Sequence, residues 1–470
     1  MERAPLLEEL LKYKNEYNLI LSMPGNKSGK AFLKDDLGRK FKETLGELDI
    51  TEVDNLDNLH QPEGIIKEAQ ELLAKTYKVN KAYFLVNGSS SGNLAAIFSA
   101  FNEGDEVLVE RNCHKSIYNA IILRKLKVVY IESVIDNNLG IFLPPRDEEI
   151  LKAFNNSKNP KGIILTNPNY FGVYYDLENT IKMLKDKGLR IIIDSAHGAH
   201  LGISKSLPKS MAKLGDYVVL SAHKTLPSLT QGAFLLVNNN DENIEFYIKA
   251  FMTTSPSYLI MASLDYSRYY LDNYGEEDYD NLIERAELWR EKINSLNKVK
   301  IIDKIEIDEN YKIDKSRYLV TLRDGFSGHK LLDYLKAKKI QAEMSFSKGV
   351  VLILSTCNSN NDFEKIYSAF NELDMNLISL IEGNYIYKNI LPTKVLEPFQ
   401  VLSLKCKKIS LKESLGKVSK SFIVPYPPGV PVVCPGEIIT NEVIEIVEEY
   451  LNNNLTVVGI DNKKVEIVDN

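Results

Sequence analysis

The chain has 470 residues, with 58 basic and 64 acidic side chains and a formal net charge of −6. This length is sufficient for two or three domains with a sizeable core. No basic block favours nucleic acid as a partner, and no run of about 18 apolar residues could cross a membrane. The four cysteines lack CxxC spacing, which is typical of a reduced, cytoplasmic protein.

Short apolar runs alternate with helical patterns through the first half of the chain. They are Tyr83–Val86, Val107–Val109, Val128–Ile131, Ile163–Thr166, Arg190–Asp194, Tyr217–Ser221 and Ala233–Val237. Continuous apolar strands that alternate with helices predict a mostly parallel sheet covered on both faces. We therefore expect a large seven-stranded α/β domain over residues 45–265, preceded by an N-terminal segment over 1–44.

The second half of the chain predicts smaller α+β units. A charged helical stretch over 266–295 is expected to connect the large domain to a small domain over 296–375. A C-terminal domain over 376–470 contains the run Pro425–Pro431, which is expected to be too rigid for a helix or a strand.

Two polar segments follow neighbouring predicted strands. One is Ser221-Ala222-His223-Lys224-Thr225, and the other begins at Asp194 and continues through His197 to His200. The carboxyl ends of strands in an open α/β sheet converge on one crevice. Asp194 and Lys224 are therefore expected to face the same pocket.

A third segment, Val86–Asn93, is rich in serine and glycine and is predicted to open a helix over Leu94–Phe101. Its hydroxyl and N–H groups would lie at a helix N-terminus, which favours an anion. Each feature alone is commonly structural: a solvated lysine, a turn aspartate, a helix cap. Together they supply the amine, the carboxylate and the phosphate site that pyridoxal 5'-phosphate (PLP) requires.

With these motifs the chain resembles the ornithine/lysine/arginine decarboxylase family of fold-type-I PLP-dependent enzymes, in its short form. The resemblance covers about residues 20–440. It rests on Pro24–Lys27, Leu56–Gly64, Arg111–Ser116, Asp194–His197, Ser221–Gln231, Thr253–Tyr258 and Pro425–Glu437.

The resemblance implies a role for each matching side chain. Lys224 would hold the cofactor covalently, Asp194 would pair with the pyridinium, and His114 would stack on the ring; these are the expected catalytic residues. The remaining expected cofactor contacts are Ala196 on the other ring face, His197 near the ring, Ser90, Ser91, Ser221 and His223 at the phosphate, and Thr253 at the phosphate of a neighbouring subunit. No metal site is expected.

Three positions depart from the family pattern. The family usually has His at Asn26, Asp at Phe346, and Ala-Glu at Lys420-Ser421. The distal cation of a basic substrate needs a negatively charged partner, and a lysine at 420 would repel it unless that side chain points to solvent. Glu343, Glu437 or a carboxylate of a second subunit could replace the missing acidic groups.

The cofactor motifs alone do not name the reaction. Aminotransferases of this fold generally clamp the substrate carboxylate with a small-domain arginine, and this chain has no arginine after Arg323. We expect decarboxylation of lysine or arginine, then ornithine, to the amine and CO2. The alternative is a divergent PLP-binding relative with another amino-acid substrate or little activity.

Assembly is expected to be a homodimer or a dimer of dimers. If Thr253 acts on a neighbouring subunit, each active site lies at a subunit interface. The matched region begins at Pro24-Gly25, which leaves no room for the N-terminal domain through which larger family members build higher rings.

Overall fold

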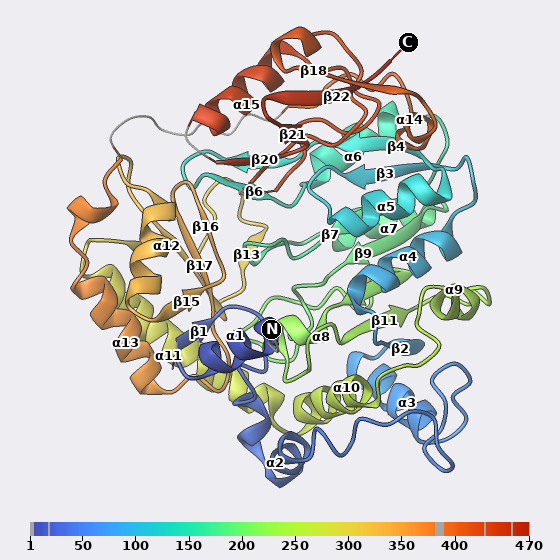
Figure 1. Cartoon of the computed structure of the whole chain (residues 1–470). Coiled ribbons are helices and arrows are strands. Elements are labelled where there is room, and N and C mark those ends of the chain that lie inside the picture. Colours follow the sequence, from blue (N-terminus) through green and yellow to red (C-terminus); the bar gives the residue numbers. More distant parts are fainter. Residues whose placement is uncertain (1–3, 17–18, 381–389, 427–428, 453–454, 470) are drawn as a thin grey trace.

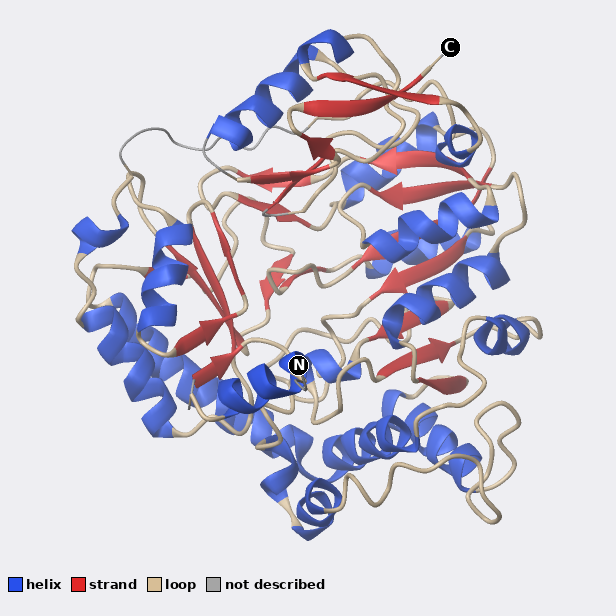
Figure 2. Ribbon diagram, in the orientation of Figure 1, coloured by secondary structure: helices blue, strands red, loops and turns tan. Residues whose placement is uncertain are grey.

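The computed structural model describes residues 4–16, 19–380, 390–426, 429–452 and 455–469. A seven-stranded sheet lies on the right of Figure 1, a four-stranded sheet lies on the left, and the C-terminal segment lies above both. Helices flank both sheets (Figure 2). Within the described residues no helix combines the length and apolar character needed to span a membrane.

The large sheet contains the seven predicted strands. They are β2 (Lys81–Leu85), β3 (Glu106–Glu110), β4 (Lys127–Ile131), β7 (Pro160–Thr166), β9 (Arg190–Asp194), β10 (Tyr217–Leu220) and β11 (Ala233–Val237). Their order is β2-β11-β10-β9-β7-β3-β4. β11 runs antiparallel to both of its neighbours, β2 and β10, and the other neighbouring pairs of this sheet are parallel. The predicted fold class, a mostly parallel α/β sheet of the fold-type-I kind, is confirmed.

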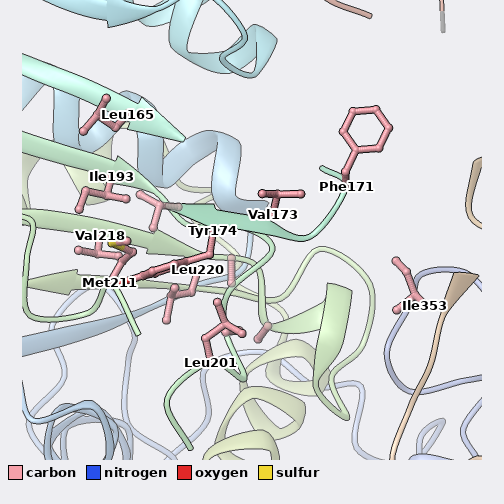
Figure 3. Close-up of a cluster of buried hydrophobic side chains, with 14 of the residues drawn as sticks. Leu165, Phe171, Val173, Tyr174, Ile193, Leu201, Met211, Val218, Leu220 and Ile353 are labelled. Carbon is pink, nitrogen blue, oxygen red and sulfur yellow. The ribbon is translucent and has the colours of Figure 1, made fainter. Parts of the chain in front are cut away.

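Apolar side chains fill both faces of this sheet. Every residue of β10 and β11 is buried. In Figure 3, Leu165, Ile193 and Val218 project from the adjacent strands β7, β9 and β10 near Tyr174 and Met211. Burying such side chains contributes about 25 cal/mol per Å2 of apolar surface, so this core holds the strands of the sheet in place.

The helices that accompany the large sheet lie before its first strand and between or after its later strands in the chain. They are α3 (Ile65–Tyr77), α4 (Gly88–Ala100), α5 (Lys115–Arg124), α6 (Asp147–Asn156), α7 (Glu178–Asp186), α8 (Ala222–Thr225) and α9 (Ile244–Ala250). Helix α4 starts earlier than the predicted Leu94. Gly88 has a φ of +82°, which glycine adopts readily, so the chain enters the helix directly and the serines form its first turn.

A helical path leads from the large sheet to the small one through α10 (Tyr258–Tyr270), the π-helix η2 (Leu271–Gly275) and α11 (Glu276–Asn294). The four-stranded sheet has the order β12-β14-β17-β16. Its elements are β12 (Lys300–Ile301), β14 (Arg317–Thr321), β16 (Met344–Phe346) and β17 (Gly349–Ile353), with α12 (Gly328–Ala337) and α13 (Asn360–Asn371). Strand β1 (Leu19–Leu21) pairs in parallel with β15 (Ile340–Ala342).

The C-terminal segment has a separate apolar core. It contains α14 (Pro398–Leu402), β18 (Cys406–Ser410), β19 (Val424–Tyr426), α15 (Asn441–Asn452), β20 (Thr456–Val458), β21 (Ile460–Asp461) and β22 (Lys464–Val468). The prediction that Pro425 lies outside regular structure is wrong, because β19 pairs with β20. A two-stranded sheet has only edge strands, where the missing N–H of proline is tolerated. Pro427 and Pro428 lie outside the described residues.

The remaining elements are short or peripheral. They are α1 (Pro5–Lys14), α2 (Asp36–Glu43), β5 (Val134–Asp136), β6 (Ile141–Leu143), β8 (Val173–Tyr175), β13 (Tyr311–Ile313) and the short 3-10 helices η1 (Ala31–Lys34), η3 (Met375–Ile378) and η4 (Lys412–Ser414). The predicted domain boundaries at 44, 265, 295 and 375 stay a prediction.

Candidate active site

The two predicted site segments meet at the carboxyl ends of adjacent strands. Val219 of β10 is paired in parallel with Asp194, the last residue of β9. The chain then turns through Ser221 into the short helix α8, which carries Lys224. The strand-end rule thus places the amine and the carboxylate on the same edge of the sheet.

Lys224 lies in a buried position beside His197. Its Nζ atom is 3.0 Å from His197 Nε2. Burial lowers the pKa of Lys224 to about 8, and the positive charge of Arg317 acts in the same direction, whereas the charges of Asp194 and Glu343 oppose the shift. The amine is therefore easier to deprotonate than an ordinary lysine.

His197 connects Lys224 to the four-stranded sheet, through Arg317 of β14. Its Nδ1 atom is 3.2 Å from a terminal nitrogen of Arg317, whose other terminal nitrogen donates to the His197 carbonyl at 3.2 Å. Burial, followed by the positive charges of Lys224 and Arg317, holds the pKa of His197 well below its usual range. Its imidazole is therefore neutral.

Arg317 is held in turn by a buried hydrogen-bonded pair, Asp314 and His200. Asp314 accepts from Arg317 Nε at 3.1 Å and lies 3.0 Å from His200 Nε2. The pKa of Asp314 is lowered despite burial, because His200, Arg317 and Ser316 stabilise the charged carboxylate. Arg317 opens β14, so this group links the small sheet to the site on the large sheet.

Asp194 is oriented by donors on two sides. Asn93 of α4 donates to Asp194 Oδ2 at 2.9 Å, and the N–H of Ala196 donates to Oδ1 at 3.1 Å. Asn93 also donates to Ser116 Oγ at 2.9 Å, and Ser116 Oγ is 2.8 Å from His114 Nδ1. The carboxylate and the expected stacking histidine thus share one hydrogen-bonded group.

His114 is the N-cap of α5, where its ring accepts from the N–H of Ser116. Much of the residue is open to solvent in the single chain. Burial of the rest of its ring lowers the pKa of His114. The negative charge of Asp194 opposes this shift, whereas the positive charges of Lys224 and Lys115 add to it. A neutral ring is the form suited to stacking.

The expected phosphate contacts lie around the start of α4 and the β10–α8 turn. Ser91 Oγ donates to the carbonyl of Gly88 at 2.8 Å, and Ser90 is exposed. Ser221 Oγ is buried without a hydrogen-bond partner among the described residues. His223 Nδ1 lies 3.0 Å from the carbonyl of Gly232.

Ala196 and Thr253 differ in their surroundings. Ala196 is buried directly after the strand end, next to Asp194. Thr253 is exposed, and its N–H donates to Asn87 Oδ1 at 3.2 Å, so it lies beside the start of α4 in the same chain. Its expected contact with a neighbouring subunit stays a prediction.

The N-terminal loop packs behind the lysine turn. The N–H of Gly25 donates to the carbonyl of His223 at 2.7 Å, and Asn26 donates to the carbonyl of Ser228 at 2.8 Å. A Cβ atom at Gly25 would lie 2.6 Å from the backbone of Leu226, so glycine is required there. Asn26 thus has a structural partner on the segment that follows Lys224.

At two of the positions that depart from the family pattern, the side chain has a structural role. Phe346 is fully buried and meets Phe171 edge-on at 5.5 Å. Lys420 Nζ donates to the carbonyls of Val401, Leu402 and Leu404 at the C-terminal end of α14. A cation is favourable at that end of a helix, so Lys420 neither points to open solvent nor faces the site.

The two candidate acidic partners differ in availability. Glu437 is fully buried and bound to Arg111 by two hydrogen bonds of 2.6 and 2.7 Å, so the expectation that it could bind substrate is wrong. Glu343 is half-buried and accepts from the N–H of Met23 at 2.9 Å and from the Tyr170 hydroxyl. The Tyr170 ring contacts His197 at a centroid distance of 4.9 Å.

Known proteins share both the sequence and the fold of this chain. The sequence profile of the Orn/Lys/Arg decarboxylase major domain matches residues 4–338, and that of the C-terminal domain matches residues 386–457. The chain belongs to the Orn/Lys/Arg decarboxylase family. The resemblance predicted from the site motifs is therefore confirmed.

Relatives within this family align over almost the whole chain. Uncharacterized protein YaaO of Bacillus subtilis is 32% identical over 98% of this chain and 97% of its own length. The arginine decarboxylase of Bacillus subtilis is 28% identical over 99% and 97%. The inducible lysine decarboxylase of Escherichia coli is 25% identical over 94% of this chain and 76% of that protein.

Solved structures agree on the fold. The constitutive lysine decarboxylase of E. coli superposes with a TM-score of 0.78 at 20% identity, covering 99% of this chain and 82% of that one. Serine palmitoyltransferase from S. paucimobilis, with a bound PLP–myriocin aldimine, gives a TM-score of 0.58 at 15% identity, covering 75% and 86%.

The structure adds side chains to which sequence reasoning gave no role. Asn93 lies inside the serine-rich segment but was not distinguished from its capping neighbours. Arg317 is remote in sequence and gives no motif. His200 stands three residues after His197. This short spacing is the one feature of the sequence that could have indicated a second functional histidine.

Proposed function

We propose that this family member is a PLP-dependent decarboxylase that converts a basic amino acid to the corresponding amine and CO2. The observation that carries the proposal is the placement of Lys224, buried beside His197, on the same sheet edge as an Asp194 held by Asn93. Membership of the Orn/Lys/Arg decarboxylase family supports the substrate class.

The residues of the site fit PLP. Ser221 Oγ is a buried hydroxyl without a partner among the described residues, and it stands at the turn before Lys224, where an acceptor such as a phosphate oxygen would satisfy it. The N-terminus of α4 adds backbone donors that favour an anion. Asp194 supplies the negative charge that would keep a pyridine nitrogen protonated.

When bound, PLP supplies an electron sink for the electron pair left as the carboxylate departs. The chain's own residues would hold and orient the reactants. Lys224 offers an amine with a lowered pKa, Asn93 and the Ala196 N–H fix the direction of the Asp194 carboxylate, and His114 offers a neutral ring from the start of α5.

Reprotonation at the former carboxyl-bearing carbon requires a donor near the reacting atoms. Lys224 and His197 are 3.0 Å apart, so a proton given up by one can be replaced through the other. Arg317 does not serve as a free carboxylate clamp, because its donors are engaged by Asp314, Tyr170 and His197. This favours decarboxylation over transamination.

The alternative, a divergent relative with little activity, rested on the substituted positions. Phe346 belongs to the apolar core and Lys420 is bound at the end of α14, so neither obstructs a cationic substrate. The proposal also includes a homodimer or dimer of dimers in the cytoplasm. Its support is the exposed Thr253 beside the start of α4 and the exposed face of His114.

A CO2-release panel tests the proposal. Purified protein with PLP is assayed with lysine, arginine, ornithine, aspartate, glutamate and neutral amino acids, and we expect turnover confined to the basic three. Lys224→Ala should lose turnover and the borohydride-reducible cofactor linkage together. Turnover of an acidic or neutral amino acid alone, or reducible PLP retained elsewhere in that variant, would contradict the proposal.

A further inference from the structure

His197 lies between a buried amine and a buried guanidinium. Its Nε2 atom is 3.0 Å from Lys224 Nζ, and its Nδ1 atom is 3.2 Å from a terminal nitrogen of Arg317. Both ring nitrogens therefore have polar partners, and turning the ring over would lose both contacts. Since its pKa is held well below the usual range, the imidazole is neutral and carries one N–H.

The partner of Nδ1 decides which nitrogen carries this hydrogen. A guanidinium has donors and no acceptor, so Nδ1 must accept from Arg317 and the N–H must be on Nε2. Arg317 cannot turn away, because it also donates to Asp314 at 3.1 Å, to the Tyr170 carbonyl at 3.2 Å and to the His197 carbonyl at 3.2 Å.

We propose that Arg317 is a positioning residue that fixes His197 as the Nε2–H tautomer, so that the imidazole donates to Lys224 Nζ and favours the unprotonated amine. An ammonium has no lone pair to accept this hydrogen bond, whereas a neutral amine has one. The inference rests on the proposed function, because the free lone pair is what PLP capture requires.

In that capture the Nζ lone pair forms a C=N bond with the cofactor aldehyde, and the aldehyde oxygen leaves as water with the two amine protons. Other charges also act on this pair of residues. Asp194, Glu343 and Arg317 act on Lys224, and Lys224, Arg317, His114 and His223 act on His197. A test must therefore separate the tautomer from the charge of Arg317.

A double-mutant cycle makes this separation, because a charge acts on Lys224 whether or not His197 is present. The full-length protein is stripped of cofactor, and the rate of PLP capture is followed by visible absorbance from about pH 6 to about pH 10. The variants are Arg317→Met, His197→Phe, the pair together, and Arg317→Lys, which keeps a donor. The exposed Arg323→Met is the matched control.

In the wild-type protein the capture rate should rise with a midpoint near the Lys224 pKa of about 8. Arg317→Met should raise this midpoint by about one pH unit, and Arg317→Lys and Arg323→Met should leave it nearly unchanged. In the His197→Phe background, Arg317→Met should shift it by less than half as much. An equal shift in both backgrounds would overturn the inference.

A second measurement decides the question without the Arg317→Met variant. The chain has six histidines, and 15N-histidine NMR of the wild-type protein identifies His197 by the signal lost in His197→Phe. We expect the Nε2–H tautomer, and an Nδ1–H tautomer would overturn the inference. If the wild-type protein captures no PLP, the proposed function fails, while the NMR result still decides the tautomer.

Discussion

Arg111 and Glu437 form a fully buried pair, joined by two hydrogen bonds of 2.6 and 2.7 Å. Arg111 also donates to the carbonyl of Pro431 at 3.2 Å and lies 4.7 Å from the centroid of the Tyr130 ring. Arg111 directly follows β3 and precedes the loop that leads to His114. The pair therefore ties the C-terminal segment to the large sheet beside the candidate active site.

Breaking this pair should destabilise the protein strongly. Glu437→Ala leaves a buried guanidinium without its counter-charge, so the free energy of unfolding should fall by about 3–5 kcal/mol. Urea unfolding followed by circular dichroism measures the change. The control is Glu372→Ala, which removes the partner of Lys338 in a largely exposed pair and should cost far less, because solvent screens exposed charges. Equal losses would contradict the prediction.

Lys420 should not influence the choice of substrate. Its ammonium binds three carbonyls at the end of α14, so Lys420→Met should lower the free energy of unfolding by about 1 kcal/mol. The ratios of kcat/KM among lysine, arginine and ornithine should remain as in the wild-type protein. Exposed Lys405→Met serves as the control. A tenfold or greater gain in kcat/KM for the basic substrates would mean that Lys420 repels them.

The strands could be predicted from the sequence, and so could the placement of Asp194 and Lys224 on one edge of the sheet. Both predictions depend on short stretches of sequence. Apolar runs mark buried strands, and the carboxyl ends of parallel strands share one edge of the sheet. The contacts of Arg317 with His197 and of Asn93 with Asp194 join residues 120 and 101 positions apart. No local pattern encodes such distant pairs.

The environment of Lys420 was equally hidden from the sequence. Its effect depends on whether the ammonium meets a substrate or a helix end, and only the position of the end of α14 beside Lys420 in the folded chain decides this. The family pattern marks residue 420 as unusual, but it does not say where the Lys420 side chain points. In the same way, nothing in the sequence separates Glu437, which is paired with Arg111, from Glu343, which is not.

Glu110 should make stability depend on pH. It is fully buried at the end of β3, where Oε2 accepts from the N–H of Thr166 at 2.7 Å and Oε1 has no partner among the described residues. Burial raises its pKa from 4.5 to about 8, and the charge of Asp194 adds to the shift. The folded protein therefore holds this proton more tightly than the unfolded chain does.

The sign follows from this difference in proton binding. The stabilisation that comes from the tightly held proton of Glu110 is complete below pH 4.5 and is lost as the pH rises through about 8. Glu110→Gln removes the titration, so its stability relative to wild type should rise by about 1.4 kcal/mol per pH unit between these limits. Urea unfolding at several pH values measures it, with the exposed Glu103→Gln as control. Parallel pH profiles for Glu110→Gln and wild type would contradict the assignment.

Of the two acidic side chains considered, Glu343 and Glu437, Glu343 is the one available to meet the distal cation of a basic substrate. It is half-buried, it is held by the Met23 N–H and the Tyr170 hydroxyl, and its charge acts on Lys224. Lys27 also lies nearby, but its ammonium already donates to the carbonyls of Ser22 and Ile353. A carboxylate oxygen can accept more than one hydrogen bond, so Glu343 keeps capacity for a substrate cation.

Glu343→Gln should therefore lower kcat/KM for lysine and arginine by about 30-fold or more, as expected when a partly buried charge pair loses one member. A neutral amino acid of the same length as lysine should be affected far less, because it has no distal cation. Tyr170→Phe keeps the ring beside His197 but removes the hydroxyl that orients Glu343, so it should give a smaller loss in the same direction. Steady-state kinetics with both substrate types measures these effects. An equal loss for charged and neutral substrates would assign Glu343 to the general structure of the site, and the substrate cation would then require a carboxylate from a second subunit.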